Sequence, residues 1–359
     1  MAIQTGVLIV GGGFAGVTVA QELEKQGIET TLVDKKDYFE VTFATLRNIT
    51  DPDKTKNRAR KKYQDLLSGR FIQSDVIEMS STSVVLADGT EIEFKQGIIA
   101  SGTRYSSMPV AKSTRAMDIG ARNDELFAFH EKLTSANKVL VIGGGVVGVE
   151  LAGEIAHAQP NIHVSLAHNS NVLLNGFKEK AQRKSLEQLN QLGVDVKFNS
   201  QYQKVDDSYI DKNTGIASDA DLVFEATGVL PNNSYLNLHL SKILNDYGYV
   251  QVNERLEVIG ENNLYALGDI ADVGEPKLGY LAQEQGQYVA KSIIKKLKGK
   301  PSKAYKRNPL MALIPVGQKD GVVQLPFAVT TLRFLVGLKQ KDLFIKKVYK
   351  AFGVVPNLQ

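Results

Sequence analysis

The sequence contains the same strand, glycine turn and helix twice, about 130 residues apart. Each copy begins with a short apolar run, which is typical of a strand buried on both faces. A helical stretch follows each glycine turn, and a second apolar strand follows each helix, at 30–33 and 162–167. The duplication predicts two parallel βαβ units. The two strand-and-turn segments are Gly6-Val-Leu-Ile-Val-Gly-Gly-Gly-Phe-Ala-Gly16 and Lys138-Val-Leu-Val-Ile-Gly-Gly-Gly-Val-Val-Gly148.

The spacing of the glycines indicates that each turn binds a dinucleotide. Gly11 permits the tight turn, Gly13 lets the backbone approach a pyrophosphate, and Gly16 lets the helix pack closely on the strand. The helix N-terminus adds free N–H groups and the positive end of its dipole. The second copy has the same spacing in Gly143, Gly145 and Gly148. A purely structural glycine turn is the alternative for each copy.

The two copies differ at the end of their second strand. The first copy has Asp34, a carboxylate that can accept hydrogen bonds from both ribose hydroxyls of an adenosine. The second copy has His168 and no acidic residue. A carboxylate there would repel the 2′-phosphate of NADPH, so we expect this unit to use both NADH and NADPH. Whether His168 contacts the nucleotide at all is left open.

A later segment is expected to bind the flavin, if the two units bind FAD and a nicotinamide dinucleotide. The strand over 263–267 runs into Gly268-Asp269, and the helix over 279–297 follows. Asp269 can hold the ribityl and phosphate region of FAD, and the helix N-terminus near Leu281 can stabilise negative charge on reduced flavin. The alternative is that Asp269 merely caps a turn.

The chain has no cysteine, which excludes several classes of flavoenzyme. Glutathione-, lipoamide- and thioredoxin-reductase chemistry passes electrons through sulfur, as does that of single-cysteine peroxidases. Electrons must therefore leave the reduced flavin directly for an acceptor. Because the chain also has only five histidines, we expect no metal site.

The C-terminal part of the chain is strongly basic. Residues 291–350 hold 15 Lys or Arg against two Asp, a net charge of +13 in a protein whose total is +4. The apolar run over 322–338 is interrupted by Pro326 and Arg333 and is too short to span a membrane. The segment over 339–352 alternates lysines with apolar residues, which predicts an interfacial helix on anionic lipid. The alternative is that its apolar residues pack on the flavin domain or on a second subunit.

These motifs together resemble the FAD-dependent pyridine nucleotide–disulfide oxidoreductase superfamily over essentially the whole chain. The features that carry the resemblance are the first glycine turn with Asp34, Ala226-Thr227-Gly228 and Gly268-Asp269. Within the superfamily the chain is similar to the ferroptosis suppressor protein branch of apoptosis-inducing-factor-like proteins, which is related to type II NADH dehydrogenases. The motifs behind this narrower resemblance are GGGVVGVE at 143–150, ALGDIADV at 266–273, PKLGYLA at 276–282 and KQKDLF at 339–344.

The resemblance implies an NAD(P)H:quinone oxidoreductase that contains FAD. It places Glu150 at an acidic position beside the nicotinamide and Lys339 in a motif near the flavin. The alternatives are a helix first-turn residue for Glu150 and a surface lysine for Lys339. Gln283 and Gln285 only loosely match the Ala-Gln motif of type II dehydrogenases. Further cofactor contacts expected from the same motifs are Phe14, Ala15, Lys35, Gly102, Gly228, Lys277, Leu281 and Ala282.

We therefore expect an α/β fold with two Rossmann-like domains and a small C-terminal module. The expected divisions are an FAD domain over 1–107 and 247–300, an NAD(P)H domain over 108–246, and a module over 301–359. The expected partners are a ubiquinone- or menaquinone-type quinone and an anionic membrane surface. A homodimer is left open. Nucleic acid is not expected as a partner, because the sequence has no recognisable nucleic-acid-binding motif. The N-terminal segment reads as a strand and not as a secretion signal, which predicts a cytoplasmic location, with peripheral attachment to the inner face of a membrane. The alternatives are a reductase of a small ferredoxin- or rubredoxin-type protein and a flavin-dependent redox-sensing binding protein.

Overall fold

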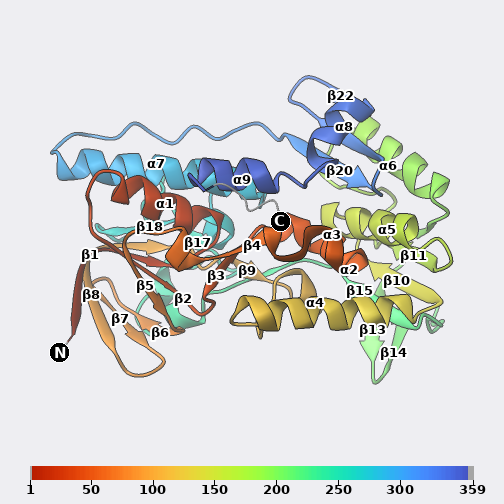
Figure 1. Ribbon diagram of the computed structural model, residues 1–359, viewed down its shortest axis with the longest axis horizontal. Helices are drawn as coiled ribbons and strands as arrows, with labels where there is room; N and C mark the ends of the chain where they lie inside the picture. Colours follow the sequence, from red (N-terminus) through yellow and green to blue (C-terminus); the bar gives the residue numbers. More distant parts are fainter. Residues whose placement is uncertain (1, 355–359) are drawn as a thin grey trace.

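The computed structural model describes residues 2–354, apart from the side chains of 54–57. Its fold is α/β, with two separate sheets (Figure 1). The first sheet is mixed, because β6 and β7 pair antiparallel, and the second is parallel. In each sheet a glycine turn connects one strand to the helix that follows it. The first sheet has seven strands in the order β5-β2-β1-β8-β7-β6, with β18 added beside β8. These strands are β1 (Ile3–Val10), β2 (Thr30–Asp34), β5 (Arg70–Gln73), β6 (Val76–Met79), β7 (Ser83–Leu86), β8 (Glu91–Ile99) and β18 (Leu264–Ala266).

Helices α1 (Phe14–Glu24) and α7 (Gly279–Leu297) pack against each other over one face of this sheet (Figure 1). The apolar run over 7–10 in β1 is buried, as the sequence predicts, and so are residues 30–33 of β2. Helix α7 has the bounds expected from the sequence, and Lys295 and Lys296 lie in its last turn, where cations complement the helix dipole. Strand β18 comes from far along the chain yet pairs in parallel with β8, so residues near Gly268 reach the same sheet edge as the first glycine turn.

The second sheet is wholly parallel and has the order β12-β11-β10-β15. Helix α5 (Val146–Ala158) packs on it, and α2 (Thr45–Thr50) from the N-terminal part of the chain packs on α5. The strands of this sheet are β10 (Lys138–Ile142), β11 (His163–Ala167), β12 (Asp195–Lys197) and β15 (Leu222–Glu225).

Smaller elements connect and cover the two sheets. The remaining helices are α3 (Pro52–Thr55), α4 (Ile119–Thr134) and α6 (Glu179–Gln191). The remaining strands before the C-terminal part form the pairs β3 (Tyr38–Glu40) with β4 (Arg60–Lys62), β9 (Thr103–Arg104) with β16 (Leu230–Pro231), β13 (Tyr202–Val205) with β14 (Ser208–Asp211), and β17 (Val250–Gln251) with β19 (Ala271–Asp272).

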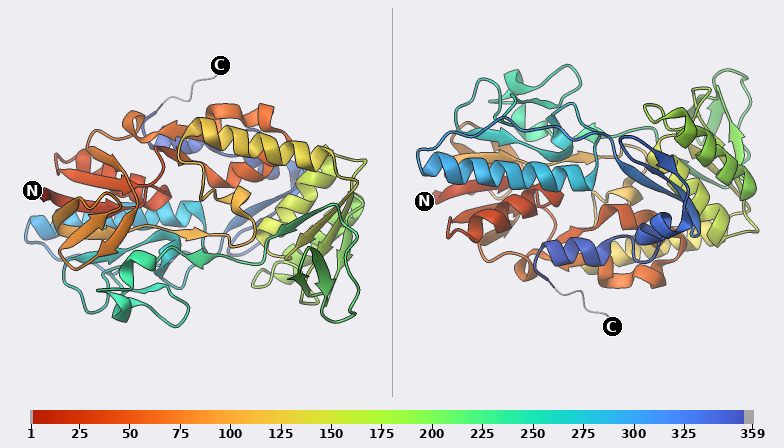
Figure 2. Two further views of the ribbon diagram at one scale, coloured as in Figure 1. Left: turned by 90° about the horizontal axis from the view of Figure 1, so that it is seen from below. Right: turned by 90° about the horizontal axis from the view of Figure 1, so that it is seen from above.

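The C-terminal part returns over both sheets. An extended stretch after α7 leads back along that helix to a three-stranded antiparallel sheet and two short helices, all visible from one side of the molecule (Figure 2, right). These elements are β20 (Ala312–Val316), β21 (Asp320–Gln324), β22 (Val329–Thr330), α8 (Arg333–Gln340) and α9 (Ile345–Ala351). No helix within residues 2–354 is both long enough and apolar enough to cross a membrane.

The expectation of an interfacial helix over 339–352 is wrong. The chain breaks at Leu343 and Phe344, which both have positive φ, so α8 and α9 are separate helices. The apolar residues of α9 are buried in the core of the first sheet, where Phe39 lies 6.2 Å from Tyr349 and 5.1 Å from Phe352, ring centre to ring centre. The alternative is correct in that this segment packs its apolar residues on the protein itself, in the core of the first sheet.

Candidate functional site

The two glycine turns have the same geometry. Gly11 has φ +104° and Gly143 has φ +115°, both in the region that L-residues rarely adopt. A Cβ on Gly11 would lie 2.4 Å from the carbonyl oxygen of Ala100, and one on Gly143 would lie 2.4 Å from that of Ala226. Both positions therefore require glycine.

The last glycine of each turn allows the helix to approach the turn closely. A Cβ on Gly16 would lie 1.9 Å from the Gly11 oxygen, and one on Gly148 would lie 1.8 Å from the Gly143 oxygen. The middle glycines, Gly13 and Gly145, are different because a Cβ there would meet nothing within 4 Å.

Gly13 and Gly145 are also the N-caps of α1 and α5, and neither helix start has a side chain bonded to it. The structure thus leaves open space beside uncapped N–H groups at both turns. This arrangement fits a pyrophosphate at each of them.

The strand ends beside the two turns are occupied by different side chains in the same role. Asp34 Oδ2 accepts a hydrogen bond from the N–H of Gly12 at 2.7 Å, and Asp34 Oδ1 accepts from the N–H of Lys36 at 2.9 Å. In the second copy, His168 Nδ1 accepts from the N–H of Gly144 at 3.1 Å. Burial lowers the pKa of His168, and the backbone of Val172 opposes this only in part.

The remaining nitrogen of this imidazole, Nε2, is enclosed and has no hydrogen-bond partner. In the second unit, His168 therefore makes the hydrogen bond to the glycine turn that Asp34 makes in the first unit. The second unit therefore has a histidine, and no carboxylate, at the position where the first unit has Asp34.

Asp269 lies at the end of the first sheet and is held by a lysine that the sequence did not single out. Lys112 Nζ is 2.6 Å from Asp269 Oδ2, and the hydroxyl of Thr103 donates to the same oxygen at 2.9 Å. Burial alone would raise the pKa of Asp269, but the positive charge and hydrogen bond of Lys112 lower it below its usual value. Asp269 is therefore ionised and, with Lys112 and Thr103, forms a polar group at the end of the first sheet.

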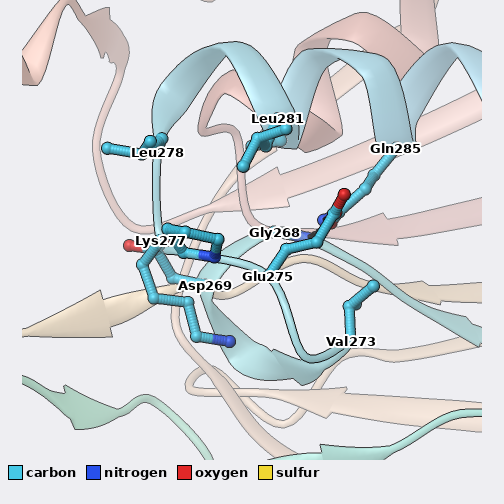
Figure 3. Close-up of a pocket in the computed structure, with 10 residues that line it drawn as sticks. Gly268, Asp269, Val273, Glu275, Lys277, Leu278, Leu281 and Gln285 are labelled. Atoms are coloured by element: carbon cyan, nitrogen blue, oxygen red, sulfur yellow. Dashed lines mark hydrogen bonds between the residues drawn. The ribbon is translucent and has the colours of Figure 1, made fainter. Parts of the chain in front are cut away.

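A pocket next to Asp269 collects several of the expected cofactor contacts (Figure 3). Gln285 Oε1 accepts from the N–H of Gly268 at 2.7 Å, and Gln285 Nε2 donates to Glu275 at 2.8 Å. Gln285, and not Gln283, is thus the glutamine that reaches this region. The pocket is lined by Gly268, Asp269, Val273, Glu275, Pro276, Lys277, Leu278, Leu281, Ala282 and Gln285.

Glu150 and Lys339, which lie 189 residues apart in the chain, form a buried ion pair. Lys339 Nζ is 2.9 Å from Glu150 Oε1 and also donates to the carbonyl oxygen of Leu313 at 3.1 Å. The ammonium lies 5.9 Å from the ring centre of Phe43, which in turn stacks on Phe14. Burial raises the pKa of Glu150, and Lys339 offsets this only partly. The pair joins the second turn of α5 to α8.

A second buried ion pair lies one helical turn along α5 and was not expected from the sequence. The guanidinium of Arg47 on α2 contacts the carboxylate of Glu154, with Nε 3.1 Å from Oε1. It also donates to the backbone oxygen of Gln340 at 2.9 Å and to the side-chain oxygen of the same residue. Gln340 follows Lys339 directly, so this contact fixes the backbone that carries Lys339.

Tyr105 is influenced by the charges of both Asp269 and Glu150. Burial, together with the negative charges of Asp269 and Glu150, raises the pKa of Tyr105 to about 12. No sequence motif marks this tyrosine, because it follows the strand and turn over 98–103 without a repeated spacing.

The other expected contacts are distributed around the same edges. Phe14 and Ala15 are buried at the start of α1, whereas Lys35 is half-buried after β2. Gly102 and Gly228 follow β8 and β15, both with positive φ and with open space where a Cβ would lie.

Comparisons with known proteins agree with this arrangement. The profile of the pyridine nucleotide-disulphide oxidoreductase family matches residues 5–286. The chain is 32% identical to ferroptosis suppressor protein 1 of Xenopus tropicalis over 97% of this chain and 96% of that protein. It is 30% identical to apoptosis-inducing factor homolog A of Dictyostelium discoideum, over 97% of this chain and 91% of that one.

Solved structures with this fold include two of low sequence identity. The sulfide:quinone oxidoreductase of Aquifex aeolicus superposes with a TM-score of 0.81 at 16% identity, over 97% of this chain and 92% of that chain. NDH2 of Plasmodium falciparum in complex with NADH superposes with a TM-score of 0.77 at 15% identity, over 98% of both chains. At such identities the likeness shows the fold alone.

The chain belongs to the pyridine nucleotide-disulphide oxidoreductase family, in the branch of ferroptosis suppressor and apoptosis-inducing-factor-like proteins. It is an oxidoreductase whose cofactors are FAD and NAD(P)H. The two open glycine turns and the polar group around Asp269 are the features of this structure that fit those cofactors.

Proposed function

We propose that this protein is an NAD(P)H:quinone oxidoreductase that works at a membrane surface. The observation that carries the proposal is the buried pair of Glu150 and Lys339, which joins the second glycine-turn unit to the C-terminal part. No cysteine is available to relay electrons, so the acceptor must approach the flavin itself. The chemistry named in two structural relatives, sulfide:quinone oxidoreductase and NDH2 with NADH, supports the same reading.

The residues of the first unit would hold FAD. Gly11, Gly13 and Gly16 would make room for its pyrophosphate, and Asp34 would bind the adenosine ribose. Asp269, kept ionised by Lys112, would accept hydrogen bonds from its ribityl hydroxyls. The remaining contacts proposed for this cofactor are Phe14, Ala15, Lys35, Gly102, Gly268, Lys277, Leu281 and Ala282.

The residues of the second unit would bind the nicotinamide cofactor. Gly143, Gly145 and Gly148 would receive its pyrophosphate, with Gly228 and His168 beside it. When bound, FAD takes up a hydride from NAD(P)H and passes two electrons on to the acceptor. Glu150, at the start of α5, would orient the nicotinamide.

The Glu150–Lys339 pair also has a use in the second half of the reaction. Converting NAD(P)H, one proton and a quinone into NAD(P)⁺ and a quinol requires one proton besides the hydride. A buried carboxyl with a raised pKa next to an ammonium can hold that proton close to the reacting groups. We assign the pair this role in addition to orienting the nicotinamide.

The test is anaerobic mixing of the yellow protein with NADH or NADPH, followed by a short-chain quinone. We expect bleaching by either nucleotide and recolouring by quinone. Bleaching without recolouring would instead point to a protein acceptor, and no bleaching would overturn the proposal.

A variant extends this test to the ion pair. Glu150→Gln should keep its flavin spectrum but be reduced at least tenfold more slowly by NAD(P)H. The matched control is Glu179→Gln, which removes an exposed carboxylate from α6 of the same unit. Equal reduction rates in the two variants would remove Glu150 from the site.

A further inference from the structure

The turn that carries Asp269 is held through its backbone as well as through its side chain. Lys112 and Thr103 bind the carboxylate of Asp269. The N–H of Gly268, one residue earlier, donates to Gln285 Oε1 at 2.7 Å. Gly268 has φ +74°, so the turn adopts a backbone conformation that glycine takes up more readily than other residues. Contacts from two separate parts of the chain therefore fix this turn.

Gln285 is itself held by a buried carboxylate. It lies in the second turn of α7, and its Nε2 donates to Glu275 Oε2 at 2.8 Å. Gln285 is 3% exposed and Glu275 is 9% exposed. Gly268, Glu275 and Gln285 lie together below α7 in Figure 3. A continuous path of hydrogen bonds thus leads from the Glu275 carboxylate to the backbone of the turn.

The extended stretch after α7 supplies further donors to Glu275. The N–H of Asn308 donates to Glu275 Oε1 at 2.7 Å, and the hydroxyl of Tyr305 donates to Oε2 at 3.1 Å. Burial, and next the negative charge of Glu275, raise the pKa of Tyr305, so its hydroxyl keeps the proton that it donates in this hydrogen bond. Donors therefore face both oxygens of Glu275.

The direction of these hydrogen bonds fixes the orientation of the Gln285 amide. A carboxylate accepts hydrogen bonds and donates none, whereas an amide has an oxygen that accepts and an NH2 group that donates. Because Glu275 takes the NH2 group of Gln285, the amide oxygen is turned toward the N–H of Gly268. If the amide turned over, its oxygen would face a carboxylate and its NH2 group would face an N–H. Both hydrogen bonds would then be lost.

We propose that Glu275 and Gln285 form a positioning pair for the flavin. Glu275 orients the amide of Gln285, and Gln285 fixes the turn that presents Asp269 to FAD. The inference rests on the assignment of Asp269 to FAD in the proposed function. Both residues act through the turn, so Gln285 has a role that is distinct from contact with the electron acceptor.

Loss of this positioning should weaken the binding of FAD more than it weakens the fold. Bound FAD would exclude water from the pocket that Gly268 and Asp269 line, so a Gly268 N–H without its acceptor would stay unpaired. In the cofactor-free protein, water can reach the pocket and bind the same N–H. The free-energy cost of a displaced amide therefore falls on the FAD-bound state. It should be observed as faster release of FAD.

The experiment follows the release of FAD from the diluted holoprotein by the rise in flavin fluorescence. Gln285→Glu places a second carboxylate against Glu275, where neither group has a hydrogen to donate and the two charges repel each other. We expect FAD release to be about tenfold faster at pH 8, which is the effect of one unpaired buried group. Gln285→Met, which removes the acceptor outright, should have a similar effect. The matched control is Gln287→Glu, which adds a carboxylate at an exposed position of the same helix.

The double variant Glu275→Gln/Gln285→Glu exchanges the two side chains and restores the polarity of the path. The carboxylate introduced at position 285 accepts from the N–H of Gly268 and from the amide introduced at position 275, so release should return to within about twofold of the wild-type rate. If Gln285→Glu releases FAD no faster than Gln287→Glu, or if the double variant is no slower than Gln285→Glu, the proposal is overturned. Asp269→Asn tests the proposed function separately. Unchanged release from Asp269→Asn would overturn the assignment of Asp269 to FAD, whereas faster release from it, with unchanged release from Gln285→Met, would overturn the positioning role alone.

Discussion

Replacing Lys339 with methionine tests whether the ion pair has the electrostatics inferred for it. Methionine keeps most of the length of the side chain but removes the charge, so the buried Glu150 loses the cation to which it is hydrogen-bonded. Removing one partner of a buried ion pair costs about 3–5 kcal/mol when the other partner stays charged. At roughly 2 °C per kcal/mol, Tm should fall by about 6–10 °C.

The loss should depend on pH in a definite direction. Burial already raises the pKa of Glu150 in the folded protein, and loss of the lysine raises it further. A carboxyl with a raised folded pKa binds its proton more tightly when folded, so ionisation favours unfolding. The penalty is absent below the unfolded pKa of about 4.3 and grows as pH rises toward the folded pKa. Lys339→Met should therefore be closest to the wild type in mild acid and furthest from it at pH 8.

The assay is thermal unfolding of the holoprotein, followed by circular dichroism and flavin fluorescence between pH 5.5 and 8. The double variant Glu150→Gln/Lys339→Met is the decisive comparison, because it removes the carboxylate that has lost its partner. We expect the double variant to recover most of the stability at pH 8. If the double variant is as unstable as Lys339→Met, or if the deficit is the same at every pH, the electrostatic reasoning is wrong and packing explains the loss.

Three further predictions address other parts of the site. Asp269→Asn should lower the flavin content of the purified protein, read as the ratio of absorbance at 450 to 280 nm, and a normal ratio would contradict its assigned role. Gly143→Ala should destabilise the fold by more than about 1 kcal/mol, because its Cβ would clash at positive φ. Gly145→Ala should fold normally and raise the KM for NAD(P)H. Equal losses of Tm in the two variants would refute this distinction. Gln340→Ala removes the side-chain oxygen to which the Arg47 guanidinium donates. We expect slower reduction by NAD(P)H with an intact flavin spectrum. An unchanged reduction rate would show that Lys339 does not need this contact to stay in place.

Local patterns predicted much of the fold. The strand over 138–142 and the helix over 279–297 have the bounds expected for them. Both follow short-range rules. The strand is an unbroken apolar run before a glycine turn, and the helix is a long stretch ended by the break at Gly299-Lys300-Pro301-Ser302. The two glycine turns were also predictable, since the glycine spacing that marks each of them lies within six consecutive residues.

Contacts between distant segments could not be predicted in the same way. Lys112 reaches Asp269 across 157 residues, and Arg47 reaches Gln340 across 293. No periodicity links such pairs, so neither Lys112 nor Arg47 carried a sequence signal. The prediction for the segment that contains α9 was wrong for a related reason. An amphipathic pattern predicts that one face of a helix is buried, but not whether lipid or protein buries it.

The position of Lys339 near the end of the chain has a consequence for how the protein is made. Both glycine turns, and with them the parts that would hold two cofactors, emerge from the ribosome well before α8 is synthesised. A chain that stops early therefore lacks the ammonium that pairs with Glu150 and the glutamine that anchors Arg47. The order of synthesis makes α8 a checkpoint, so that a product truncated before α8 is left with a buried carboxylate that has lost its partner and with an incomplete site.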